Sequence, residues 1–251
     1  MSGHSKWSSI KHKKGVADAR RGRLFSKLSR AIIVAARDGG PDPENNTALA
    51  NAIEKARDNS MPKDNIERAI ARGSGAGPDG QAYEQITYEG YAPGGVALLV
   101  DAVTDNRNRT ASEIRHLFAK HDGNLGASGA VAWLFERRGV VLVDVDSADE
   151  DEVTLAAAEG GAEDVEREGS SYRITCEHEA LPAVRAALDE AGIPHDSAEA
   201  TMLPKTTVAI EDEATAKKVL RLVDALEEND DVQDVYANFD IPERVLEAVA
   251  P

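Results

Sequence analysis

The sequence predicts an α+β protein with three domains: an amino-terminal helical bundle and two ferredoxin-like α/β domains, the second inserted into the first. Three observations support this prediction. Apolar residues recur at helical spacing as far as residue 72, strands alternate with helices beyond a glycine-rich linker, and residues 138–204 follow the order βαββαβ. The chain of 251 residues, 41% of them hydrophobic, is long enough for several compact cores.

The first domain is predicted over residues 18–80, including its linker. Leu24, Leu28 and Ile32 lie on one face of a helix that begins near Asp18 and ends at the Gly39-Gly40-Pro41 segment. A second helix is expected from Thr47 to Arg57. A third is expected from Pro62, a residue suited to a first helical turn, to Arg72. Residues 73–80, GSGAGPDG, form the linker, and residues 1–17 are predicted to be a flexible basic arm.

The middle domain is predicted to be discontinuous, formed by residues 81–137 together with 205–251. Its predicted elements are strands Ile86–Tyr91, Val96–Val103 and Gly129–Glu136, with a helix to Lys120 opened by a capping box at Thr110–Glu113. The strand Thr207–Ile210, the helix Glu213–Glu228 and the strand Val232–Phe239 are too few to fold alone. We therefore expect them to complete this domain.

The inserted domain is predicted over residues 138–204. Its six predicted elements, in chain order, are strand Val140–Val145, a helix capped at Ser147–Glu150 and ending near Glu159, strands Ala162–Arg167 and Tyr172–Glu177, helix 179–191 and strand Ala198–Leu203. This order predicts an antiparallel sheet with both helices on one face. Residues 139–204 contain 17 acidic side chains against three arginines, so the domain is strongly acidic.

Charge is distributed unevenly along the chain, although the net charge is −16. Residues 1–37 contain ten lysines and arginines and a single acid, Asp18. Residues 1–72 carry a net charge of +7, which leaves −23 for the remainder. One end of such a chain attracts polyanions and the other repels them.

The basic arm and the first helix are therefore the first candidate nucleic-acid site, because lysine and arginine release condensed counterions when they neutralise phosphates. Trp7 could stack on an unpaired base. The alternative is a solvated tail, or an arm docked on the chain's own acidic surface. The candidate residues here are Lys6, Trp7, Lys11, His12, Lys13, Lys14, Arg20, Arg21, Arg23, Lys27 and Arg30.

The loop 104–110 is the second candidate, because it leaves a strand and enters a helix. Free N–H groups at a helix start, with Arg107, Asn108 and Arg109 beside them, would suit a phosphate. The capping box predicted at Thr110 would use some of those donors. The alternative is that the two arginines pair at the surface with Asp101, Asp105 or Glu113.

Other patterns predict no enzyme chemistry. The third helix has mixed charge and does not resemble a base-reading helix of a helix-turn-helix. The six histidines lack metal-ligand spacing, the acids at 144–151 do not fit an EF-hand, and the glycine-rich segments lack the lysine of a P-loop. Cys176 alternates with Tyr172 and Ile174, which predicts a core residue. We expect no catalytic, cofactor-binding or metal site and no small-molecule substrate.

Location follows from what the chain lacks. Its apolar stretches, such as Val96–Val100, are too short to cross a bilayer, and its charged amino terminus lacks the apolar core of a secretory signal. A single cysteine cannot form a disulfide framework within one chain. We therefore expect a cytoplasmic protein without a membrane partner, and we favour a monomer.

Five segments resemble the YebC/PmpR family, which includes the mitochondrial translational activator of cytochrome oxidase subunit one. They are GHSKWSSIKHKKGVADARRGRLFSKLSRAI at 3–32, MPKDNIERAI at 61–70, YEGYAPGGVALLVDAVTDNRNRT at 88–110, GNLGASGAVAWLF at 123–135 and DVQDVYANFDIP at 231–242. The least similar segment is the acidic stretch 144–168. The resemblance implies a helical domain followed by two α/β domains, the middle one discontinuous, and no enzyme activity.

The resemblance implies two functions, and the residues leave a third open. Family members are described as DNA-binding transcriptional regulators or as ribosome-associated factors that assist translation through proline-rich sequences. The first hypothesis is a regulator that binds duplex DNA, and the second is a factor that binds ribosomal RNA. The third is a protein-interaction adaptor dominated by its acidic domains. The lack of a clear recognition helix favours RNA, whereas the family's usual label favours DNA.

Overall fold

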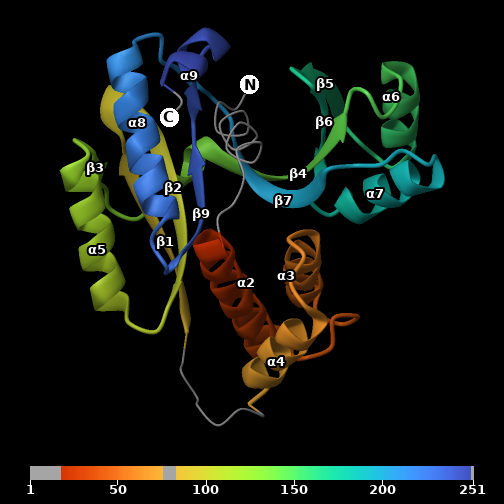
Figure 1. The fold of residues 1–251 in the computed structure, drawn as a ribbon, viewed down its shortest axis with the longest axis horizontal. Coiled ribbons are helices and arrows are strands. Elements are labelled where there is room, and N and C mark those ends of the chain that lie inside the picture. The colour runs from red at the N-terminus through yellow and green to blue at the C-terminus, as the bar shows by residue number, and fades with distance from the viewer. Residues whose placement is uncertain (1–17, 76–82, 250–251) are drawn as a thin grey trace. The chain divides into compact units, whose positions relative to one another are not determined.

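The computed structural model describes residues 18–75 and 83–249, and it divides the chain into two compact units (Figure 1). The first unit comprises the described residues up to Leu134 together with those from Pro204 onward. The second comprises Phe135–Leu203. Both contain antiparallel sheets packed against helices, so the predicted α+β class is confirmed. No helix among the described residues is both long and apolar enough to span a bilayer.

Three helices form a bundle at the start of the first unit: α2 (Asp18–Gly39), α3 (Thr47–Asp58) and α4 (Lys63–Gly73). All three were predicted, because their apolar residues recur at intervals of three and four. Their buried core includes Leu28 and Ile32 of α2 and Leu49 and Ile53 of α3. Asn46 caps α3 by accepting from the Leu49 N–H, and its amide donates to the carbonyls of Ala35, within α2, and Gly40, directly after it.

The rest of the first unit is built around a four-stranded antiparallel sheet, in the order β3-β1-β2-β9. Its strands are β1 (Glu84–Tyr91), β2 (Ala97–Thr104), β3 (Asn124–Leu125) and β9 (Val232–Ala237). Two helices pack on one face, α5 (Arg107–Lys120) and α8 (Glu213–Glu227), where Phe118 and Leu222 meet Leu98 and Val100 in one buried cluster. The chain after residue 204 thus supplies both an edge strand and a covering helix.

Short elements complete this unit. The 3-10 turn η1 (Pro93–Gly95) joins β1 to β2, with Gly94 at φ +79°. The predicted strand Thr207–Ile210 is reduced to β8 (Val208–Ala209), which pairs in parallel with β10 (Phe239–Asp240) outside the main sheet. The seven-residue helix α9 (Glu243–Val249), which buries Val245 and Leu246, was not predicted from the sequence.

The predicted strand Gly129–Glu136 is wrong for most of its length. Residues 126–131 form a loop that ends in a 3-10 turn, η2 (Ala132–Leu134), and only Phe135 onward is strand. The edge of the sheet is instead β3, which pairs with β1. The cause is the buried carboxylate of Glu89, which accepts hydrogen bonds from the N–H groups of Gly129, Val131 and Ala132 and so removes them from strand pairing.

The second unit has the ferredoxin-like order β5-β6-β4-β7. Its elements are β4 (Phe135–Asp144), α6 (Glu150–Glu159), β5 (Asp164–Glu168), β6 (Ser171–Glu177), α7 (Leu181–Glu190) and β7 (Ser197–Pro204). The two helices and the central strands enclose a core that includes Val141, Val153, Ile174 and Val184. The predicted capping box at Ser147–Glu150 is wrong, because Asp149 is the N-cap and accepts from the Asp151 N–H.

Candidate nucleic-acid interface

The predicted basic residues fall into three groups in the structure. Five of them lie outside the described residues: Lys6, Lys11, His12, Lys13 and Lys14. The candidate Trp7 lies outside them as well. Arg20 lies in the first turn of α2, and Arg21 and Arg23 follow it with exposed side chains. Lys27 and Arg30, two turns further along the helix, are partly buried. The exposed basic side chains of α2 therefore lie near its beginning, and the basic side chains further along contact the rest of the first unit.

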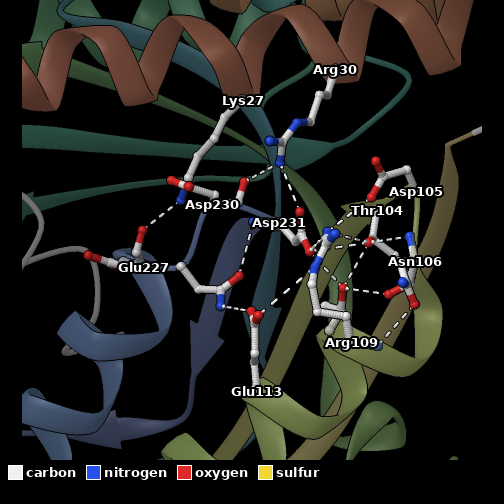
Figure 2. A network of polar contacts seen from close by, with 12 residues as sticks. Lys27, Arg30, Thr104, Asp105, Asn106, Arg109, Glu113, Glu227, Asp230 and Asp231 are labelled. Carbon is white, nitrogen blue, oxygen red and sulfur yellow. Dashed lines mark hydrogen bonds and ion pairs between the residues drawn. The ribbon is translucent and has the colours of Figure 1, made fainter. Parts of the chain in front are cut away.

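Lys27 and Arg30 contact the end of α8 and the segment that joins it to β9 (Figure 2). Nζ of Lys27 donates to the carbonyl oxygen of Glu227 at 2.6 Å. Arg30 Nη1 lies 2.5 Å from the carbonyl oxygen of Asp230 and 3.1 Å from Oδ1 of Asp231. Both cations of α2 therefore bind acceptors of their own chain. The arm, for which docking on the acidic surface was the alternative, lies outside the described residues.

Asp231 is the centre of this network, and its carboxylate is almost completely buried. Its Oδ2 accepts from Arg109 Nη2 at 2.8 Å and from the Thr110 hydroxyl at 2.7 Å, and the Thr104 hydroxyl lies at 3.2 Å. Its own N–H donates to Oδ1 of Asn229. One carboxylate thus links α2, the end of β2, the start of α5 and the entry to β9.

The electrostatics of the network follow from this burial. Burial alone would raise the pKa of Asp231, but the hydrogen bonds from Arg109 and Thr110 and the positive charge of Arg109 outweigh it, so the pKa lies below 3.8. The pKa of Lys27 is lowered from 10.5 mainly by burial, which the negative charges of Glu227, Asp234 and Asp230 only partly oppose. These groups satisfy one another instead of facing a free anion.

The start of α5 differs from the prediction. The N-cap is Asn106, whose Oδ1 accepts from the Arg109 N–H, and the helix begins at Arg107. The predicted capping box at Thr110 is therefore wrong. Thr110 is buried one turn inside the helix, where its hydroxyl contacts Asp231. A cap must have non-helical backbone, and the buried carboxylate keeps Thr110 in the helix.

Arg109 forms the surface ion pairs that the alternative interpretation of the loop predicted. Its Nη2 lies 3.0 Å from Asp105, and its Nε lies 3.9 Å from Glu113, in addition to the Asp231 contact. Arg107 and Asn108, in the same first turn, are exposed. Of the three residues predicted here, Arg109 thus serves the internal network, and the other two face solvent.

A hollow of about 680 Å³ opens beside the network. Three arginines (Arg23, Arg30, Arg109) line it, together with Tyr83, whose ring lies 6.0 Å below the Arg30 guanidinium. Five carboxylates line it as well: Asp105, Glu113, Glu228, Asp230 and Asp231. The acids outnumber the guanidinium groups, so this hollow does not suit a polyanion.

The bundle is attached to the sheet by further contacts of the same kind. Lys55 of α3 donates to Oδ1 of Asp234 on β9 at 2.7 Å, and Arg37 near the end of α2 donates to the carbonyl of Tyr83. With Lys27 and Arg30, four basic side chains of the bundle thus find acceptors in or beside the sheet. The basic side chains of this region therefore attach the bundle to the sheet, in addition to their predicted role in binding nucleic acid.

The other candidate chemistry finds little support. On α4, Lys63 pairs with Glu67 at 3.6 Å. Arg68 donates to Oδ1 of Asn65 and to the carbonyl oxygen of Asp64. Both basic side chains thus bond to neighbours on the same helix. Cys176 is fully buried, and burial raises the pKa of its thiol, which disfavours a nucleophile. Among the described residues, Glu177, His178 and Glu179 could approach one metal ion, but Glu177 already binds Arg138.

Sequence reasoning missed the residues that organise these sites. Asp231 stands in the acidic run 227–231, which resembles a solvated surface segment, and no local pattern marks it as the buried member. Glu89 sits in a strand between Tyr88 and Gly90, where an outward-facing acid would be ordinary. Both are recognisable only from the N–H groups and guanidinium groups that the tertiary structure brings to them.

The fold and the site define a class of protein: an α+β chain whose basic helical bundle is joined by ionic contacts to a discontinuous antiparallel domain. An acidic ferredoxin-like unit is inserted in the sequence of that domain. Residues 5–76 match the TACO1/YebC protein N-terminal domain, and residues 83–239 match the TACO1/YebC second and third domain. The chain belongs to the TACO1/YebC family, and the resemblance found in the sequence is confirmed.

Relatives from several bacteria are similar over their full length. A protein of Rubrobacter xylanophilus is 62% identical over 250 residues, and one of Thermobifida fusca is 53% identical over 250 residues, each covering 100% of both chains. Both are named "Probable transcriptional regulatory protein". The crystal structure of a conserved hypothetical protein from Aquifex aeolicus matches with a TM-score of 0.80 and 54% identity, covering 90% of this chain and 93% of that one.

Proposed function

We propose that this protein is a non-enzymatic, cytoplasmic regulator of gene expression that binds nucleic acid through its basic amino-terminal region and acts on transcription, as the names of its relatives suggest. The observation that carries the proposal is the polarised charge. Residues 1–37 hold ten basic side chains against one acid in a chain of net charge −16. Such an arrangement favours one oriented contact with a polyanion.

The contacts of the described residues divide the basic region by role. Lys27, Arg30 and Arg109 bind carbonyl and carboxylate oxygens of the chain itself. Arg21 and Arg23 are exposed at the beginning of α2, directly after the basic segment 1–17. We therefore assign phosphate binding to the arm and the start of α2, with Arg107 and Asn108 as a second exposed contact, and anchoring to the other three residues.

Backbone binding alone would give affinity without sequence selectivity. Two basic side chains of α4, Lys63 and Arg68, bond to neighbours on the same helix, which weakens its case as a helix that reads the major groove. This observation favours a second candidate function, in which the partner is ribosomal RNA and the protein assists translation. Both candidates use the same basic surface.

Binding should be measured by fluorescence anisotropy on a labelled DNA duplex and on a ribosomal RNA hairpin, over a range of salt concentrations. Affinity is expected to fall steeply with salt. Arg21→Gln/Arg23→Gln should weaken binding and reduce the slope of log K against log salt by up to about 2, since each lost phosphate contact contributes about 0.9. Lys217→Gln/Arg221→Gln on α8 removes the same charge from exposed positions elsewhere and should bind as the parent does.

The preferred ligand separates the two candidates. Tighter binding to the duplex, with the protein at the top of a sucrose gradient of lysate, supports the transcriptional regulator. Ribosome co-migration that RNase abolishes supports the translation factor. A flat salt response, or equal binding by the two double variants, would refute nucleic-acid binding through this region and leave the acidic protein-interaction adaptor.

A further inference from the structure

Two exposed aromatic side chains, Tyr91 and Trp133, lie at the end of β1 and in the turn η2. The sequence has eleven aromatic residues, and Tyr88 and Phe135, close in sequence, are partly or fully buried. Trp133 is nevertheless 66% exposed and Tyr91 37% exposed. A tryptophan that faces solvent forgoes the stabilisation that burying its large ring would provide, so its position calls for an explanation other than stability.

The two rings are held by a common acceptor. The Tyr91 hydroxyl and the Trp133 Nε1–H each donate to the carbonyl oxygen of Ala130, both at 3.1 Å. Tyr91 ends β1, and Trp133 lies in the 3-10 turn η2, so the shared carbonyl brings together side chains from different elements. These hydrogen bonds involve the Tyr91 hydroxyl and the Trp133 Nε1–H at the edges of the side chains, and not the faces of the rings.

The loop that carries Ala130 is itself fixed by a buried anion. Glu89 is 6% exposed, and its carboxylate accepts from the N–H groups of Gly129, Val131 and Ala132 at 2.6, 2.7 and 2.8 Å. The carbonyl oxygen of Glu89 also accepts from the Gly126 N–H. A buried carboxylate with three backbone donors restricts the loop strongly, so the two rings stand on a preorganised support.

We propose that Tyr91 and Trp133 form a platform on which one unpaired nucleobase of a bound strand stacks. This inference rests on the proposed function and specifies it, because it requires a strand with at least one unstacked base. Aromatic faces accept any base, which suits a protein without an evident base-reading helix. Lys205 lies beside the platform, since its N–H donates to the Leu134 carbonyl at 2.8 Å, and its exposed side chain offers a cation to the adjoining phosphate.

Tryptophan fluorescence can test the platform directly, because the chain has only two tryptophans, Trp7 and Trp133. In a Trp7→Phe protein, Trp133 is the only tryptophan. Titration with a single-stranded oligouridine should quench its emission, whereas a fully paired duplex of equal length should quench it much less. The affinity for oligouridine should fall roughly 5- to 150-fold in Trp133→Ala, and the slope of affinity against salt should not change.

Matched variants separate stacking from damage to the fold. Trp133→Phe keeps a ring and should restore part of the affinity, and Tyr91→Phe keeps its ring but loses the bond to Ala130. Leu155→Ala removes an exposed apolar side chain from the second unit, where Leu155 is 65% exposed, and should bind as the parent does. Urea unfolding midpoints of Trp133→Ala and of these three variants should lie near that of the parent.

The outcomes distinguish this inference from the proposed function. If Trp133→Ala binds oligouridine as tightly as the parent while Arg21→Gln/Arg23→Gln still weakens binding, the platform is refuted and the proposed function stands. Quenching by a proline-rich peptide but not by oligouridine would assign the rings to a protein ligand and would also refute the platform. If the parent binds no nucleic acid at low salt, both proposals fail together.

Discussion

At the scale of single residues, the same side chain can be a ligand for phosphate or an anchor within the fold, and its neighbours decide which. Arg30 and Arg109 carry the charge that a phosphate needs, yet both contact the carboxylate of Asp231. A buried carboxylate is costly unless charged donors surround it, so Asp231 holds these two arginines in place. Arg21 and Arg23, near the beginning of α2, make no such contact with Asp231 and are exposed.

Replacing Asp231 should therefore destabilise the first unit. Asp231→Asn removes the negative charge and turns an amide toward Arg109 and Thr110, which need an acceptor. We expect a loss of about 1–3 kcal/mol in the free energy of unfolding, because the two arginines are partly exposed and solvent compensates in part. Urea denaturation measures this loss. Asp230→Asn is the control, since Asp230 contacts Arg30 through its backbone carbonyl.

The same variant has a pH signature. The folded-state pKa of Asp231 lies below its ordinary value of 3.8, so its contribution to stability is complete above pH 3.8 and is lost as the pH falls through the lowered pKa. The stability difference between the parent and Asp231→Asn should therefore be constant near neutrality and shrink in strong acid. A difference that instead grows as the pH falls from neutrality toward 3.8 would mean that the folded protein raises the pKa of Asp231.

At the scale of elements, the helical bundle depends on a close approach between α2 and α4. A Cβ at Gly73 would lie 2.4 Å from the carbonyl oxygen of Ile33 and 2.8 Å from Cβ of Ala36. Backbone cannot yield to such a contact as a flexible side chain would. The glycine that ends α4 is thus required by packing and not only as a helix terminator.

Gly73→Ala should accordingly lower the free energy of unfolding by about 1–3 kcal/mol, the usual cost of overpacking. Gly22, within α2, has no atom near the position of an added Cβ. Gly22→Ala should stabilise the helix by about 0.5–1 kcal/mol, because alanine loses less backbone freedom on folding. Thermal unfolding of both variants measures the two effects, and equal shifts would contradict the packing argument.

At the scale of the whole molecule, the two units have separate cores. The buried clusters of the sheet and of the bundle contain no residue of 135–203, and the cluster of the second unit contains none from outside it. The two points where the chain leaves and re-enters the first unit are adjacent, because the Lys205 N–H donates to the Leu134 carbonyl. An insertion between adjacent points disturbs its host little.

Replacing residues 135–203 with a short Gly-Ser linker should therefore leave a first unit that unfolds cooperatively, as circular dichroism can establish. The deleted segment carries eighteen acids and five arginines, so the net charge changes from −16 to −3. Affinity for a DNA duplex or RNA hairpin should rise at low salt, where repulsion acts over the longest range. Weaker binding by the deletion variant would instead assign part of the nucleic-acid contact to the second unit.

Much of the architecture could be predicted because helices and strands follow from local periodicity. Each of the three bundle helices and the order βαββαβ arise from residues that alternate or recur within a short window. Two of the errors share one cause. The strand expected at Gly129–Glu136 and the cap expected at Thr110 both have the right local residues, but carboxylates from distant positions, Glu89 and Asp231, claim their N–H and hydroxyl groups.

The sequence by itself determined the α+β class, the family and the polarised charge that points to nucleic acid, because periodicity, motifs and net charge are properties of the chain in order. Only the tertiary structure decided which basic side chains are anchors and which aromatic rings are exposed. Those outcomes depend on partners far apart in sequence, such as Arg30 with Asp231 and Trp133 with the loop that Glu89 holds. Burial gives such contacts their strength, and burial is a property of the folded molecule.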